Sequence, residues 1–187
     1  LGPSGTLQVT NTATLVLGNF NTMSHPIQIT GGDTLTISTA YSPTISSVIS
    51  ETAMSASLIK TGSGKLTLSN ANTYTGLTTV SAGILALNGG SIARDVDVQS
   101  SATLQGTGTI GNNVHVFAGG TIRPGNSIGT LNIGGALTLD SMSSTFIEID
   151  PTTTSLIAVT GAVALAGDLT IFADPGTYAS SFSYTIL

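Results

Sequence analysis

Two pairs of carboxylates stand two residues apart in this sequence. Asp95 is followed by Asp97, and Glu148 is followed by Asp150. Residues two apart on a β-strand point to the same side, so either pair could supply the acid and the base of a glycoside-cleaving site. No basic or aromatic platform that could hold a sugar accompanies either pair in the sequence. We therefore expect all four residues to be solvated carboxylates at the edges of the fold.

The other residues that could take part in catalysis or bind a metal are isolated in the sequence. His25 and His115 lie far apart, and no spacing of Asp, Glu and His resembles a set of metal ligands. Ser127 lies in a Gly-x-Ser-x-Gly-like stretch from 125 to 129, but no helix and no histidine follow it, as a nucleophile elbow requires. The stretch 31–33 (Gly-Gly-Asp) is a fragment of a calcium-binding repeat that does not recur. The sequence predicts no catalytic residue, no cofactor-binding residue and no metal ligand.

These residues lie among short segments in which apolar and polar residues alternate. The clearest are Leu66–Leu68, Val96–Val98, Val114–Val116, Leu137–Leu139, Ile147–Ile149 and Leu169–Ile171. Such alternation predicts β-strands with one buried and one exposed face, and it places His115 on the exposed side. No window of eleven or more residues has helical spacing of apolar residues. The sequence therefore predicts an all-β fold.

The strand pattern repeats along the chain. Val96 and Val98 recur as Val114 and Val116, and the stretch 102–104 recurs as 120–122 at the same spacing. Repeats of about 20 residues, built from short strands and glycines, are typical of a parallel β-helix in which each coil stacks on the one before. At about 20 residues per coil, the chain would make roughly eight to nine coils.

The composition agrees with stacked coils. The 187 residues include only four Lys or Arg, nine Asp or Glu, and no Cys. In a stack, like charges would recur every ~4.8 Å, which disfavours charged residues. So few basic residues argue against nucleic acid and anionic membranes as partners. The sequence starts at Leu1 without a recognisable signal segment, and we expect a piece excised from a longer protein.

Residues 58–85 resemble the passenger-associated repeat of bacterial autotransporters. The matching positions are Lys60, Gly62, Gly64, Leu66, Leu68, Asn72, Tyr74, Gly76, Thr78, Val80, Gly83 and Leu85. Leu77 and Ile84 depart from the pattern, because Gly and Thr are common there. Residues 106–111 and 124–131 are similar to a pattern near the end of such passengers, which includes Pro124, Gly125, Asn126 and Gly129.

The resemblance implies a right-handed parallel β-helix at the surface of a Gram-negative bacterium, or secreted from it. Residues 1–150 would form the coils, and residues 151–187 would form a C-terminal cap or hairpin, similar to an autochaperone segment. The roles implied for Asn72 and Tyr74 are structural, in a turn or ladder and over a coil edge. The implied partners are upstream passenger coils and the protein's own C-terminal outer-membrane β-barrel, which lies outside this sequence.

The expected function is a non-enzymatic stalk, without cofactors, that nucleates passenger folding during translocation and supports surface display. One alternative is an adhesin or self-association module that contacts a host cell or a neighbouring cell. The other is a surface polysaccharide hydrolase that uses Asp95 and Asp97, or Glu148 and Asp150, as its acids.

Overall fold

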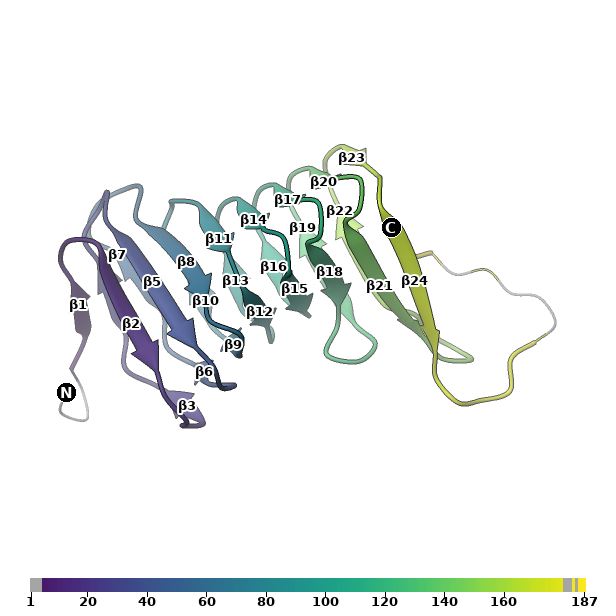
Figure 1. Ribbon diagram of the computed structural model, residues 1–187, viewed down its shortest axis with the longest axis horizontal. Helices are drawn as coiled ribbons and strands as arrows, with labels where there is room; N and C mark the ends of the chain where they lie inside the picture. The colour runs from purple at the N-terminus through teal and green to yellow at the C-terminus, as the bar shows by residue number, and fades with distance from the viewer. Residues whose placement is uncertain (1–4, 180–182, 184) are drawn as a thin grey trace.

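The chain folds as a succession of short β-strands joined by tight corners (Figure 1). The computed structural model describes residues 5–179, 183 and 185–187, and within these residues it contains 24 strands and no helix. Accordingly, no helix in this part of the chain is long and apolar enough to cross a membrane. The strands divide into eight successive coils, each of which contributes one strand to each of three faces.

The three faces run along the whole stack, and every pairing between the named strands is parallel (Figure 1). The first face holds β2 (Ala13–Leu17), β5 (Thr34–Thr39), β8 (Ser57–Thr61), β11 (Thr78–Val80), β14 (Val96–Val98), β17 (Val114–Val116), β20 (Leu137–Leu139) and β23 (Val163–Ala164). The second face holds β3 (Thr22–Met23), β6 (Thr44–Ile45), β9 (Lys65–Leu68), β12 (Gly83–Leu87), β15 (Ala102–Gly106), β18 (Thr121–Pro124), β21 (Ser144–Ile149) and β24 (Asp168–Ala173).

The third face is divided into two sheets. Its first part holds β1 (Leu7–Val9), β4 (Ile27–Ile29) and β7 (Ile49–Glu51). Its second part holds β10 (Ala71–Asn72), β13 (Ser91–Ile92), β16 (Thr109–Ile110), β19 (Thr130–Ile133) and β22 (Leu156–Val159). The parallel β-helix that the sequence predicts is thereby confirmed.

The register between coils follows the repeat seen in the sequence. Val96 pairs with Val114, and Val98 pairs with Val116, as the recurrence predicts. The coil that separates Leu137 from its strand partner Val163 is longer. The additional residues lie in the corners, so the strands of each face keep their stacking while the corner loops vary in length.

The core consists of columns of inward side chains, one column for each inward position of a coil. On the second face, Leu66, Leu85, Leu104 and Ile122 follow one another up the stack, and all four are fully buried. Burying one such side chain contributes about 1.5–3 kcal/mol of transfer free energy. Because each member packs against the same position of its neighbours, the coils stabilise one another.

The coils continue past the run 151–155. Strands β22, β23 and β24 pair in parallel with β19, β20 and β21, so residues 156–173 complete an eighth coil. Leu169 and Ile171, at inward positions of β24, are 53% and 50% exposed, because no further strand among the described residues packs beyond β24. After β24 the chain returns, and the Ile157 N–H donates a hydrogen bond to the Ile186 carbonyl. The division at residue 150, and a capping role for 151–187, stay predictions.

The alternation of faces gives a direct test on strand β15. We expect Leu104→Ala to lower the free energy of unfolding by about 2–5 kcal/mol, because it opens a cavity in a closed column. Thr103→Ala, on the outward side of the same strand, should cost about 0.5 kcal/mol. Urea unfolding followed by circular dichroism measures both, and equal losses would contradict the assignment of faces.

Candidate functional site

The pair Glu148 and Asp150 is held in two different environments. The Asp150 carboxylate accepts hydrogen bonds of 2.6–2.8 Å from the backbone amides and hydroxyls of Thr152 and Thr153. These bonds hold the pKa of Asp150 down to about 2. The Glu148 carboxylate is paired with the Arg123 guanidinium at 3.1 Å. Asp150 is therefore ionised at neutral pH, so in a glycosidase pair it could act only as base or nucleophile, and the acid would have to be Glu148, which is paired with Arg123.

The neighbours of Glu148 correct one expectation from the sequence. Arg123 belongs to β18, one coil below, and Phe172 on β24 is the strand partner of Glu148, one coil above. Phe172 stacks on Phe146 with ring centroids 5.6 Å apart. The sequence interpretation of this pair overlooked these neighbours: Arg123 and Phe172 lie about one coil away in the sequence, whereas Phe146 stands two residues before Glu148.

The second carboxylate pair lies beside His115. Asp97, on the outward side of β14, is the strand partner of His115, and Asp95 accepts a hydrogen bond from the Asn113 amide at 3.0 Å. Burial raises the pKa of Asp97, and this rise is opposed by His115 and increased by Asp95. The His115 Nε2 atom lies 2.9 Å from a carboxylate oxygen of Asp140. No group of three or more His, Asp or Glu placed to hold a metal ion occurs in the described part of the chain.

The remaining candidates also lack catalytic surroundings. His115 is outward, as the sequence predicts, but its ring is partly covered by Phe117, with centroids 3.8 Å apart. Ser127 lies in the corner loop between β18 and β19, both strands, so it does not stand at a strand-to-helix turn. His25 lies between β3 and β4, and its carbonyl accepts a hydrogen bond from the Ser47 hydroxyl. In the stretch 31–33, the Asp33 carboxylate accepts a hydrogen bond from the Asn11 amide at 2.7 Å.

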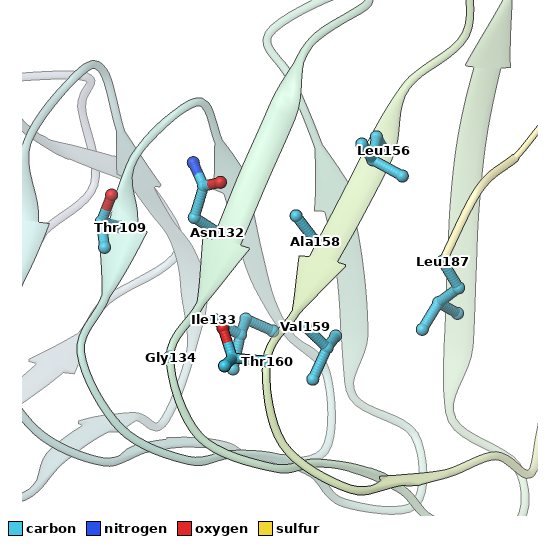
Figure 2. A pocket seen from close by; sticks show the side chains of 9 residues that line it. All are labelled: Thr109, Asn132, Ile133, Gly134, Leu156, Ala158, Val159, Thr160 and Leu187. Carbon is cyan, nitrogen blue, oxygen red and sulfur yellow. The ribbon is translucent and has the colours of Figure 1, made fainter.

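Two hollows near the last coil contain little that could react. Figure 2 shows the larger, of about 430 Å³, whose nine labelled residues come from β16, β19, β22, the corners that follow and Leu187. Its side chains are apolar, or belong to Thr and Asn. The second hollow, of about 280 Å³, lies against β21 and β24, and Asp168 provides its one carboxylate side chain. Neither hollow brings together a nucleophile, a base and an acid.

The densest set of buried polar groups lies instead in the segment 51–83. Lys60, on β8, points inward and is fully buried, and its ammonium donates to the carbonyls of Thr61, Gly62 and Ala82 at 2.8, 3.0 and 3.1 Å. Burial lowers the pKa of Lys60 to about 8. The first two acceptors belong to its own corner, and Ala82 belongs to the corner of the next coil.

Asn72 joins three successive coils. Its side-chain oxygen accepts a hydrogen bond from the Ile49 amide in the coil below, at 3.0 Å. Its side-chain nitrogen donates to the carbonyls of Asn70, in the same coil, and Ser91, in the coil above, both at 3.0 Å. Strands β7 and β10 belong to different sheets of the third face. The Asn72 side chain therefore accepts the hydrogen bond from the Ile49 amide in place of a backbone carbonyl of β10.

Tyr74 and Glu51 complete this set. Tyr74 is fully buried, its hydroxyl lies 2.7 Å from the Thr78 hydroxyl, and burial raises its pKa. The Glu51 carboxylate accepts hydrogen bonds from the amide and hydroxyl of Thr75 and from the Ala56 amide. Partial burial works to raise the pKa of Glu51, but these hydrogen bonds and the charge of Arg94 lower it overall.

The glycines of the segment mark close contacts between corners. A Cβ atom on Gly64 would collide with the backbone of Tyr41, one on Gly76 with the carbonyl of Ala56, and one on Gly62 with the backbone of Thr39. Gly83 has a φ of +66°, and a Cβ there would collide with the carbonyl oxygens of Gly62 and Gly64. Glycine at these positions lets one corner lie directly on the corner below.

The stretch 124–129 forms the corner after β18. Pro124 is the last residue of that strand, and Gly125, with a φ of +86°, donates its amide to the Gly106 carbonyl in the coil below. The Asn126 side chain accepts a hydrogen bond from Gln105, and the Gly129 carbonyl accepts one from the Leu156 amide in the coil above. These residues therefore connect three coils, as Asn72 does.

The fold and these contacts define a parallel β-solenoid whose coils are joined by buried polar side chains and glycine corners. Comparison with known families adds that the passenger-associated-transport-repeat model matches residues 58–87. Two curated relatives are an extracellular serine protease of Serratia marcescens, 46% identical over 76 residues, and the adhesin BmaC autotransporter of Brucella suis biovar 1 (strain 1330), 43% identical over 91 residues.

These matches cover 41% and 48% of this chain, but only 7% and 2% of the two relatives. The chain thus spans a small part of each relative's length. No solved structure matches it. The repeat and the relatives identify the chain as a segment of an autotransporter passenger, exposed at the surface of a Gram-negative bacterium or secreted from it.

Asn72 provides a test of the contacts between coils. We expect Asn72→Ala to lower the free energy of unfolding by about 3 kcal/mol, because it leaves the buried Ile49 amide and two carbonyls without this partner. Asn88→Ala, at an exposed corner, is the matched control and should cost about 0.5 kcal/mol. Chemical denaturation measures the difference, and similar values for the two variants would contradict the bridging role.

Gly83 provides a test of corner stacking, with Gly89 as its control. Both have positive φ, +66° and +72°, but a Cβ on Gly89 would have no atom within 4 Å. Gly89→Ala should therefore cost only the backbone strain, about 1–2 kcal/mol. Gly83→Ala should cost at least about 3 kcal/mol, because the corner below must move as well. Equal losses in thermal or urea unfolding would show that the two corners do not touch.

Proposed function

We propose that these coils are a non-enzymatic stalk of an autotransporter passenger, on which neighbouring coils fold during translocation across the outer membrane and which supports surface display. The observation that carries the proposal is the satisfaction of buried polar groups between coils. Asn72 and Lys60 complete their hydrogen bonds only with groups of adjacent coils. A formed coil thus offers the next one a template of backbone groups, polar anchors and apolar columns.

The physical basis is the cost of starting a solenoid. An isolated coil has no strand partner and cannot bury its inward side chains, whereas a coil added to an existing stack gains both at once. Leu169 and Ile171 on β24 are half exposed in this chain, and they offer the apolar surface against which an added coil would pack. In this proposal the stack has two partners: further passenger coils and the outer-membrane translocator of the same protein.

Two features support a role without catalysis. Glu148, the residue that would have to act as the acid of its pair, is bound in an ion pair with Arg123, and the Asp95 carboxylate accepts a hydrogen bond from the Asn113 amide. The relatives named as serine proteases match this chain over 76 residues, which is 7% of their length. A shared stretch of this kind suits a common stalk better than a common catalytic site.

Adhesion is a second candidate function, and one surface feature favours it. Phe146 and Phe172 stack on the outward side of the second face beside the ion pair of Arg123 and Glu148, and Phe172 is 49% exposed. Exposed aromatic rings next to charged groups are common in recognition surfaces. One relative of this chain is named as an adhesin. A stalk that carries such a surface could serve display and adhesion together.

The stalk function is tested with the full-length protein that carries these coils. Leu104→Asp places a charge in a closed core column, whereas Thr103→Asp places the same charge on the outward side of the same strand. We expect Leu104→Asp to slow passenger refolding and to reduce the protease-resistant passenger at the cell surface by about tenfold, as burying an unpaired charge is strongly unfavourable. Thr103→Asp should leave both unchanged.

Normal refolding and display of the Leu104→Asp passenger would contradict the stalk function. Loss of cell–cell or cell–surface binding in Phe172→Ala cells with normal display would support adhesion separately. Unchanged binding in those cells would argue against the aromatic surface as an adhesive site.

A further inference from the structure

The Lys60 ammonium stands inside the solenoid, where charged groups are rare. Lys60 is an inward residue of β8 between Ile37 of β5 and Val80 of β11, and all three are fully buried. It forms no ion pair among the residues that the structure describes. Its three protons instead meet three backbone carbonyls, so its hydrogen-bonding capacity is fully used.

The three acceptors come from two different coils. Thr61 is the last residue of β8, and Gly62 begins the corner that follows it, between the first and second faces. Ala82 lies in the same corner of the next coil, 22 residues further on. Gly62 and Gly83, both with positive φ, allow these corners to approach so closely that their carbonyls converge on one point. The ammonium is thus fully bonded only when the next coil is in place.

We propose that Lys60 is a positioning residue that sets the register of the next coil, through the meeting of its ammonium with the Ala82 carbonyl. The inference rests on the proposed function, because register matters when coils are added one by one. A slip of one residue would turn the side chains of β11 to the wrong face. A slip of two residues would keep each side chain of β11 on its proper side of the sheet. On the first face, the packing of the apolar columns alone distinguishes the native register poorly from this slipped one.

Lys60 excludes the slip of two residues. In a slipped coil, the Ala82 carbonyl no longer stands above Gly62, and an ammonium proton remains unpaired in an apolar interior. This is the use of a buried polar group that is best attested in other folds, where one such group fixes the register of a packed repeat. Among the strands packed against β8, neither β5, β11 nor β12 carries a titratable residue, and Lys65 of β9 is at an outward position.

The same geometry makes folding depend on pH. Burial lowers the pKa of Lys60 to about 8, below its ordinary value of 10.5. Between these values the unfolded chain binds more protons than the folded chain, so stability rises with pH from about 8 toward 10.5, and below pH 8 Lys60 contributes no pH dependence. Tyr74, whose pKa burial raises, titrates above pH 10 and acts in the opposite sense. The pH range in which stability reports on Lys60 alone therefore ends near pH 9.5.

The absence of cysteine from the sequence permits a direct test of register. Ile59 and Thr79 are strand partners at outward positions, so a chain with Ile59→Cys and Thr79→Cys should form a disulfide in the native register. A chain with Ile59→Cys and Ser81→Cys reports a slip of two residues. Each pair is made in the chain with Lys60, with Lys60→Met, and with Lys65→Met as the control for loss of an outward lysine.

We expect Lys60→Met to lower the yield of the native disulfide after refolding at least threefold and to raise the slipped one, whereas Lys65→Met changes neither. The folding equilibrium constant of the chain with Lys60 should rise about tenfold or more between pH 7 and pH 9.5, and this rise should disappear in Lys60→Met. Native disulfide in full yield, or an unchanged pH dependence, in the Lys60→Met chain would overturn the proposal.

If the Lys60→Met chain does not refold, a disulfide between residues 59 and 79, formed before refolding, should restore it, because the crosslink then supplies the register. Failure of this crosslink to restore refolding would also overturn the proposal. These measurements use the isolated chain and do not depend on surface display. The stalk function can therefore fail its own test while the register role of Lys60 stands, and the reverse also holds.

Discussion

The structure depends on one constraint: every inward position of a coil must match the same position of the coils above and below. In an antiparallel sandwich a mismatch is local, but in a stack of parallel coils it is passed to every later coil. The columns that pass through Leu66, Leu85 and Leu104 meet this constraint with apolar side chains, whose packing tolerates exchange among Leu, Ile and Val. Their tolerance leaves the choice of register to other groups.

The buried polar residues supply that choice. Asn72 bonds to groups one coil below and one coil above, and Lys60 bonds to a carbonyl of the next coil. Each of these contacts has a direction and a fixed length, unlike apolar packing. The scarcity of charge elsewhere also follows from the stacking of coils, since like charges repeated along a column would lie ~4.8 Å apart and repel one another. A single buried ammonium among carbonyls is therefore tolerated where a column of lysines would not be.

Much of the fold could be predicted from the sequence. The recurrence of Val96 and Val98 as Val114 and Val116 predicted both the parallel pairing and its register, because stacked coils repeat their strand pattern. The lengths of the longer coils could not be predicted. Their additional residues lie in corner loops such as 125–129, which belong to no repeating strand ladder, and so leave no periodic signal in the sequence.

The candidate sites were less accessible to sequence reasoning. The neighbours of Glu148 come from β18 and β24, and pairing Arg123 with Glu148 requires the exact length of the coil between them. The inward direction of Lys60 was also hidden, since a lysine in a strand is normally read as an exposed residue. Its alternation with buried Leu58 was the available signal, because residues two apart share a face.

The measurement that tests the stacking of coils most directly is a distance along the stack. Thr14 and Thr138 occupy the same outward column of the first face, six coil steps apart through Thr36, Ile59, Thr79, Asp97 and His115. Cysteines introduced at both positions can be spin-labelled without interference, since the sequence has no other cysteine. At ~4.8 Å per step, pulsed electron paramagnetic resonance should give a backbone separation of about 29 Å, and about 24 Å when Thr36 replaces Thr14. Equal distances for the two pairs, or a separation far below about 20 Å, would contradict a continuous stack of coils.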